Sequence, residues 1–251
     1  MHKKNKIYVV SEFVDKKTNS TGYYWYKTIK GISRKKNNIS VISLSESCDK
    51  AINENNKVSY IPVKNISRNL GTGFIKKLID NFIVSFKFTL KIAKHARKND
   101  IVFSGTNPSL IVLFISILKI FKRFKWVVLV NDVFPENLVP AKLVSKNSFL
   151  YKFIIGLFNF AYKKVDKIIV IGRDMRDLIA KKTNNLSNIK YISNWVDLKD
   201  ISPNFQSKAL EVSSEEKLVF QFFGNMGIVQ GLDILLESIS KTKNKKAKFN
   251  F

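Results

Sequence analysis

The sequence contains few of the residues that build disulfide frameworks or metal centres. Cys48 is the single cysteine among 251 residues, and His2 and His95 are the only histidines. One cysteine excludes an intrachain disulfide and a multi-cysteine metal site, and two histidines argue against a histidine-rich one. We therefore expect no bound metal and no disulfide, and this cysteine usage is compatible with the reducing cytosol.

Long apolar runs are also missing. The longest run, residues 110–118, is well short of the roughly 20 residues that a membrane-spanning helix needs. The run at 7–10 is too short for the core of a secretory signal peptide. We expect a cytoplasmic protein that is either soluble or held at a membrane surface.

Acidic residues are scarce compared with basic ones. The chain has 44 Lys and Arg against 19 Asp and Glu, a formal charge of +25. Such a chain is attracted to anionic lipid, nucleic acid or phosphorylated small molecules. A compositional origin stays open, because most of the excess is lysine in a chain that is also rich in Asn and Ile. The lysines are scattered and no nucleic-acid-binding motif is found, so we expect no nucleic-acid partner.

Two expected helices, 74–98 and 148–164, place lysines beside an apolar stripe. An ordinary surface helix with a solvated face explains this pattern. A basic amphipathic helix lying on anionic lipid explains it as well.

The chain does contain the material for a sizeable core, with 45% hydrophobic residues and 20 Phe. Strand and helix patterns alternate along it. Strands are expected at 6–11, 38–44, 58–63, 101–103, 127–130, 167–171 and 189–192, and helices at 23–36, 74–98, 108–123, 148–164 and 174–182. This alternation is typical of an α/β fold with a Rossmann-like doubly wound parallel sheet.

A polar stretch at 199–216, which contains Pro203, predicts a linker after an amino-terminal domain at 1–198. A strand at 218–223 and a helix at 231–240 follow it. We expect residues 217–251 to be the first βα unit of a second Rossmann-like domain.

Residues 127–136 read Val-Val-Leu-Val-Asn-Asp-Val-Phe-Pro-Glu. The apolar run has the length and the β-branched content of a buried strand, and Pro135 forces the chain out of the sheet. Ligands of open parallel sheets sit beyond the carboxyl ends of the strands, so Asp132 and Glu136 are candidate catalytic carboxylates. A plain turn explains them too, with Asp132 capping the next element and Glu136 pairing with a lysine such as Lys142.

Gly224-Asn-Met-Gly227 lies between an expected strand and an expected helix. Glycines at such a turn allow the backbone to approach a ligand, and free N–H groups at a helix start favour a phosphate. Many ordinary βα turns also contain two glycines, so both interpretations stay open.

Taken in order, the motifs are similar to a known family. The motifs are Asp132-Val-Phe-Pro-Glu136, Val165-Asp-Lys-Ile-Ile-Val-Ile-Gly172 with Met175, Ser193-Asn-Trp-Val-Asp197, and Phe223-Gly-Asn-Met-Gly227 with Gln230-Gly-Leu-Asp233. Together they resemble bacterial retaining glycosyltransferases of the GT-B type in glycosyltransferase family 4. The likeness is strongest to the WbuB-like enzymes of surface-polysaccharide and O-antigen assembly, and it covers nearly the whole chain.

The resemblance implies two Rossmann-like domains, the first binding a lipid-linked saccharide acceptor and the second a nucleotide-sugar donor. It implies no metal and no cofactor, since the nucleotide-sugar is a substrate. Asp132 and Glu136 would be catalytic. The acceptor-side loops would contribute Thr21, Gly22, Asn107 and Asn131, and the donor side would contribute Asn194, Gly224, Asn225, Gly227 and Gln230.

Members of this family continue well beyond the length of this chain. The resemblance therefore implies that residues 1–251 are cut within the donor domain and are inactive alone. A non-catalytic basic module that binds membrane or acceptor is the main alternative. An epimerase on the same two-domain scaffold is another, because fold does not fix function.

Overall fold

The structure, a computed structural model, describes residues 5–17, 19–35, 38–45, 48, 52, 58–64, 74–196, 218–224, 226 and 230–251. The chain divides into two compact units, which are taken separately below. The first comprises Met1–Glu136 and Lys146–Ser193, and the second Asn137–Ser145 and Asn194–Phe251.

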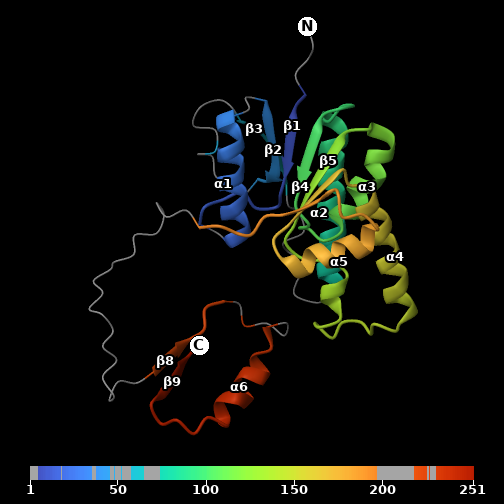
Figure 1. Cartoon of the computed structure of the whole chain (residues 1–251). Coiled ribbons are helices and arrows are strands. Elements are labelled where there is room, and N and C mark those ends of the chain that lie inside the picture. The colour runs from blue at the N-terminus through green and yellow to red at the C-terminus, as the bar shows by residue number, and fades with distance from the viewer. Residues whose placement is uncertain are drawn as a thin grey trace. The chain divides into compact units, whose positions relative to one another are not determined.

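The first unit is built on a seven-stranded parallel sheet (Figure 1). Its strands are β1 (Ile7–Val10), β2 (Ile39–Leu44), β3 (Val58–Val63), β4 (Ile101–Ser104), β5 (Lys125–Val130), β6 (Lys167–Val170) and β7 (Ile189–Tyr191). Their order is β3-β2-β1-β4-β5-β6-β7, so the chain reverses its direction across the sheet between β1 and β4. This is the predicted doubly wound α/β fold, and the reversal is the point where such sheets bind ligands.

Helices cover both faces of this sheet (Figure 1). On one face α1 (Ser20–Lys35) buries Trp25, Tyr26 and Ile29 against β1, β2 and β4. The other face is covered by α2 (Phe74–His95), α3 (Ile111–Lys122), α4 (Phe149–Lys163) and α5 (Arg173–Thr183). The central strands are therefore buried from two sides, which explains their continuous apolar sequences.

β3 has the predicted bounds: it continues through Pro62 to Val63, because it is an edge strand and an edge tolerates a residue without an N–H donor. Two other element ends differ from the prediction. α2 ends at His95 instead of residue 98, and the turn that follows places Asn99 at φ 70°. α3 begins at Ile111, so Pro108 precedes the helix and its carbonyl accepts from the Ile111 N–H at 3.0 Å.

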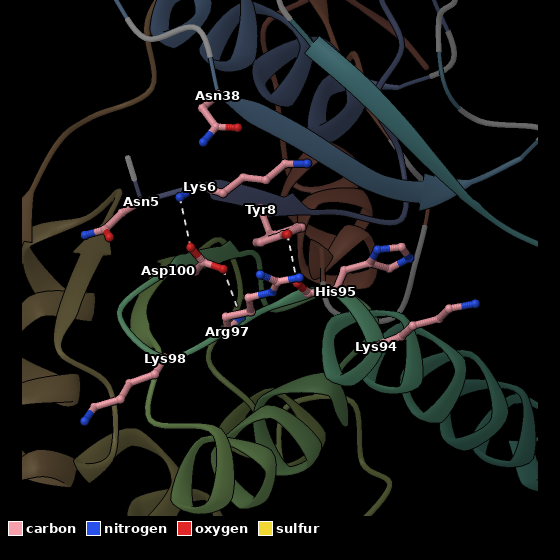
Figure 2. A pocket seen from close by; sticks show the side chains of 9 residues that line it. All are labelled: Asn5, Lys6, Tyr8, Asn38, Lys94, His95, Arg97, Lys98 and Asp100. Atoms are coloured by element: carbon pink, nitrogen blue, oxygen red, sulfur yellow. Dashed lines mark hydrogen bonds between the residues drawn. The ribbon is translucent and has the colours of Figure 1, made fainter. Parts of the chain in front are cut away.

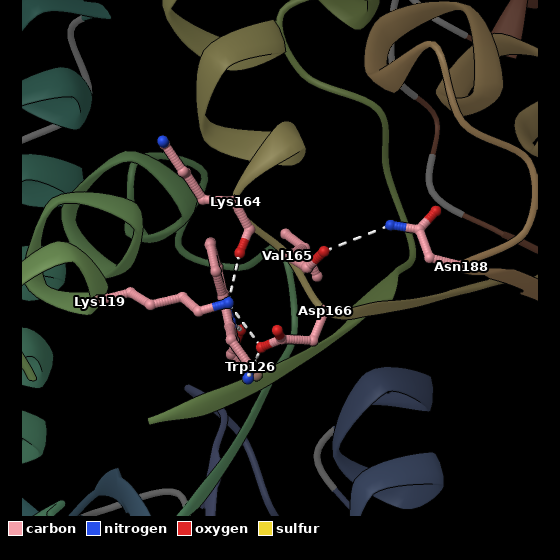
Figure 3. A network of polar contacts seen from close by, with 7 residues as sticks. Lys119, Trp126, Lys164, Val165, Asp166 and Asn188 are labelled. Carbon is pink, nitrogen blue, oxygen red and sulfur yellow. Dashed lines mark hydrogen bonds and ion pairs between the residues drawn. The ribbon is translucent and has the colours of Figure 1, made fainter. Parts of the chain in front are cut away.

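A polar network ties β5 to β6 at the amino-terminal edge of the sheet (Figure 3). One carboxylate oxygen of Asp166 accepts from the Lys119 ammonium and from the Trp126 N–H, each at 2.6 Å. Lys119 also donates to the Lys164 carbonyl at 2.6 Å. These contacts give Asp166, the second residue of the Val165-to-Gly172 motif, a structural role.

The second unit contains β8 (Leu218–Gln221), α6 (Leu232–Ser240) and β9 (Ala247–Asn250). β8 and β9 pair in parallel in a sheet of their own, and the rings of Phe220 and Phe249 stack at 5.1 Å. This is a βαβ unit, as expected for the start of another Rossmann-like domain. The predicted linker at 199–216 lies outside the described residues, so the domain boundaries stay predictions.

Candidate active site at the carboxyl edge of the sheet

Three loops meet beyond the carboxyl ends of β1, β4 and β5. The Gly105 N–H donates to the Val10 carbonyl at 3.2 Å, which joins the ends of β1 and β4. The hydroxyl oxygen of Thr106 accepts from the N–H groups of both Asn131 and Asp132 at 3.4 Å, which joins the ends of β4 and β5. The structure thereby brings Asn107, Asn131 and Asp132 to one edge of the sheet.

Asp132 is the exposed carboxylate of this edge. Among the described residues its side chain makes no hydrogen bond, so the alternative that Asp132 caps the next element finds no support. The element that follows is a single 3-10 turn, η2 (Glu136–Leu138). Asp132 is therefore available to a ligand that approaches the strand ends.

Glu136 is engaged elsewhere. Its carboxylate accepts a hydrogen bond from the ammonium of Lys182 on α5, and that lysine side chain is only 4% exposed. The alternative that Glu136 pairs with a lysine is therefore confirmed, although the partner is Lys182 and not Lys142. Lys182 reaches the carboxylate because α5 packs against the sheet beside α4. A catalytic role for Glu136 stays a prediction, and its contacts favour a structural one.

Tyr162 on α4 shares this buried site. The Lys182 ammonium lies 5.9 Å from the centre of its ring. Burial, and then the negative charges of Glu136 and Asp132, raise the pKa of the Tyr162 hydroxyl far above its usual value. Burial also lowers the pKa of Lys182, against the opposing effect of Glu136. The Tyr162 hydroxyl therefore stays neutral, and the Glu136 carboxylate favours the charged form of Lys182.

Two glycines, Gly22 and Gly105, allow close packing around the loops that follow β1 and β4. Gly22 lies in the first turn of α1, where its N–H donates to the Asn19 side-chain oxygen at 2.7 Å. A Cβ at Gly22 would lie 2.8 Å from the Asp15 carbonyl oxygen. A Cβ at Gly105 would lie 3.2 Å from the ring of Trp25. The glycines let α1 and the β4 loop pack closely, and Thr21 is half-buried beside them.

Gly22→Ala should lower the free energy of unfolding by about 1–3 kcal/mol, because the Asp15 backbone must move away from the added methyl group. The matched control is Gly31→Ala on the same helix, where nothing lies within 4 Å of the added Cβ. That change should stabilise by up to about 1 kcal/mol through helix propensity. Urea denaturation followed by tryptophan fluorescence measures both, and equal effects of the two substitutions would contradict the packing argument.

The proposed donor residues belong to the second unit. Asn194, Gly224 and Gln230 are all exposed. Gly224 has φ +154° and Gly231 has φ +63°, so the turn between β8 and α6 uses backbone that other residues rarely adopt. No hydrogen bond joins Asn194, Gly224 and Gln230 in the described part of this unit. Asn225 and Gly227 lie outside the described residues.

Sequence reasoning missed two residues of this edge. Thr106 is 6% exposed and spans the ends of β4 and β5, and Gly105 admits the ring of Trp25. The available signal was a Gly-Thr pair directly after a strand.

Within the described ranges, no group of three His, Cys, Asp or Glu side chains could hold a metal ion. No helix in the part that the structure describes is long and apolar enough to cross a membrane.

Comparison with known proteins supports the fold. No family model matches the chain. Crystal structures of Anabaena Alr3699/HepE with UDP and glucose, and with UDP-glucose, superpose with TM-scores of 0.56 and 0.55 at 14% sequence identity. They cover 98% and 97% of this chain, which covers 60% and 59% of theirs. The chain thus has the Rossmann-like α/β fold of these structures.

A curated relative is more similar in sequence. The Probable glycosyltransferase WbjE of Pseudomonas aeruginosa is 38% identical over 263 aligned positions, which include 98% of this chain. The chain spans 62% of the length of that relative.

Proposed function

We propose that this chain forms the acceptor-side domain and the start of the donor-side domain of a glycosyltransferase. The observation that carries the proposal is the 38% identity to WbjE over 98% of this chain. The structural neighbours hold UDP and UDP-glucose, which supports a nucleotide-sugar as the donor. Because the chain spans 62% of WbjE, we assign the transfer to a chain of the relative's length and expect none from residues 1–251 alone.

The finer proposal concerns the substrates. A hexosyl or N-acetylhexosaminyl group would pass to a lipid-linked acceptor during assembly of a bacterial surface polysaccharide, in the manner of retaining, WbuB-like members of glycosyltransferase family 4. The acceptor would approach the loops that carry Asn107, Asn131 and Asp132. The donor diphosphate would approach the turn at Gly224, where the backbone has φ +154°.

Transfer is tested with a chain of the relative's length that includes residues 1–251. The protein is incubated with radiolabelled UDP-glucose, UDP-N-acetylglucosamine or UDP-N-acetylgalactosamine and with undecaprenyl-pyrophosphate-linked sugar, and label is counted in the lipid fraction. We expect incorporation from one donor. If no label enters the lipid fraction from any of the three donors, the proposal is overturned.

The outer surface of α2, α3 and α4 supports a membrane-bound acceptor. These helices pack side by side, α2 on α3 and α3 on α4. Their exposed apolar side chains include Leu78, Phe82, Phe86, Leu90, Ile117, Ile120, Phe121, Phe149, Phe153 and Phe160. Each helix also carries lysines, among them Lys87 and Lys91 on α2, Lys122 at the end of α3, and Lys152 and Lys163 on α4. A surface that is both apolar and basic fits an anionic bilayer, with the rings in the interface and the ammonium groups on the lipid phosphates.

Phe121→Ser combined with Phe149→Ser should reduce sedimentation with phosphatidylglycerol vesicles at least fivefold. These rings are 77% and 86% exposed and would lose their insertion into the bilayer. Phe223→Ser, a change at a ring that is 82% exposed in the second unit, is the matched control. Binding should also fall with salt, because exposed charges are screened within about 10 Å at 0.1 M. Equal sedimentation with neutral phosphatidylcholine vesicles would contradict this surface.

A further inference from the structure

A polar cavity lies at the edge of the sheet opposite to the candidate active site. It has a volume of about 470 Å³, within the range of small-molecule sites. It is formed where β1 begins, where β2 is entered and where α2 turns into β4 (Figure 2). Nothing in the proposed transfer reaction uses this edge.

The lining of this cavity is strongly basic. It contains four basic side chains, Lys6, Lys94, Arg97 and Lys98, and one carboxylate, Asp100. Figure 2 shows the side chain of Arg97 directed towards Tyr8, whereas Lys94 and Lys98 point away from it. The Lys6 ammonium lies 5.4 Å from the centre of the Tyr8 ring. Lys6 and Arg97 are therefore the two cations that converge on the cavity from β1 and from the turn after α2.

The acceptor groups around the cavity are already occupied by the protein. The two oxygens of Asp100 accept from the Lys6 N–H at 3.0 Å and from the Arg97 N–H at 2.9 Å. The Tyr8 hydroxyl donates to the His95 carbonyl at 2.9 Å, which satisfies one of the orphan carbonyls at the end of α2. These contacts hold Asp100 and Tyr8 in place through backbone groups, so they do not use the ammonium of Lys6 or the guanidinium of Arg97.

We propose that this cavity is a binding site for a phosphate or pyrophosphate group. Guanidinium and ammonium groups are the side chains that bind phosphate oxygens most strongly, and here they come from two different elements around one cavity. The group would belong to a phosphorylated small molecule or to the head group of an anionic lipid. The site is independent of the proposed transfer, because it lies at the other edge of the sheet.

His95 reports on such an anion from within the cavity. Burial lowers the pKa of its imidazole, and the positive charges of Lys94, Lys91 and Lys6 lower it further. Arg97 and Asp100, on the turn after α2, also line the cavity. A bound anion favours the imidazolium form, so the pKa of His95 should rise when the site fills.

The first experiment titrates the full chain with inorganic pyrophosphate by calorimetry. Lys6→Gln combined with Arg97→Gln should weaken binding at least tenfold. Lys181→Gln combined with Lys190→Gln removes the same charge from exposed positions on α5 and β7 and should change binding less than twofold. No binding by the native chain, or equal weakening by both pairs, would overturn the site and would show only attraction to the overall charge of +25.

The second experiment follows His95 by proton NMR in His2→Gln, which leaves a single histidine. Saturating pyrophosphate should raise its pKa, and Lys6→Gln with Arg97→Gln should abolish the rise. Phosphatidylglycerol vesicles in place of pyrophosphate distinguish a lipid head group from a soluble ligand. A pKa of His95 that neither additive moves would overturn the proposal. Asp132→Asn should leave both readouts unchanged, which separates this site from the transfer reaction.

Discussion

Lys182→Met should lower the free energy of unfolding by about 3 kcal/mol. The Lys182 side chain is 4% exposed and that of Glu136 is 21% exposed, so removal of the ammonium leaves a carboxylate largely buried without a countercharge. The second carboxylate oxygen of Glu136 is buried and has no hydrogen-bond partner among the described residues, so it offers no compensation. Urea denaturation, followed by the fluorescence of the buried Trp25 and Trp126, measures the loss.

The double variant Glu136→Leu with Lys182→Met should recover most of that loss. A buried ion pair is costly to desolvate, and replacement of both partners by apolar side chains is often neutral. Burial already lowers the pKa of Lys182 in spite of its partner, which shows the same cost. The exposed neighbour gives the control Lys181→Met, with an expected change within about 0.5 kcal/mol. A double variant as unstable as Lys182→Met alone would refute the pairing argument.

Most of the fold could be predicted from the sequence because its signals are local. Short β-branched runs such as residues 127–130 alternate with amphipathic segments, and parallel strands buried on two faces give continuous apolar sequences. The remaining errors lie at element ends. α2 ends at His95 and α3 begins at Ile111, and periodicity does not specify the backbone turns at these ends, such as φ 70° at Asn99.

The candidate site was predictable only in part, because its assembly depends on contacts between distant segments. Asp132 was found from one strand end and the turn that follows it. Thr106 was missed, since its role comes from hydrogen bonds to backbone 25 and 26 residues away. A lysine partner for Glu136 was among the alternatives, but the particular lysine was missed for the same reason: Lys182 is 46 residues away and no spacing rule connects the two. The periodicity of apolar residues locates the ends of strands. It does not show which side chains from distant segments come together at those ends.

Asp132→Asn should lower the rate of sugar transfer about 100-fold, measured in a chain of the relative's length that includes residues 1–251. The substitution keeps the shape of the side chain and removes the charge. In our proposal that charge stabilises the positive charge that develops on the sugar ring or orients the acceptor hydroxyl. The kcat should fall more than the KM rises, because the interaction is made mainly in the transition state.

The same substitution should change the free energy of unfolding by less than about 0.5 kcal/mol, since Asp132 is exposed and its side chain makes no hydrogen bond to another described residue. Asp177→Asn is the matched control, an exposed carboxylate on α5 whose ion-pair partner is the neighbouring Arg176. It should leave both transfer and stability unchanged. If Asp132→Asn loses activity only in proportion to its loss of stability, Asp132 has no catalytic role. The same conclusion follows if Asp132→Asn and Asp177→Asn are equally active. The acceptor loops at Asn107 and Asn131 would then be the groups to test, because Thr106 holds the backbone of that edge in the same arrangement without the carboxylate.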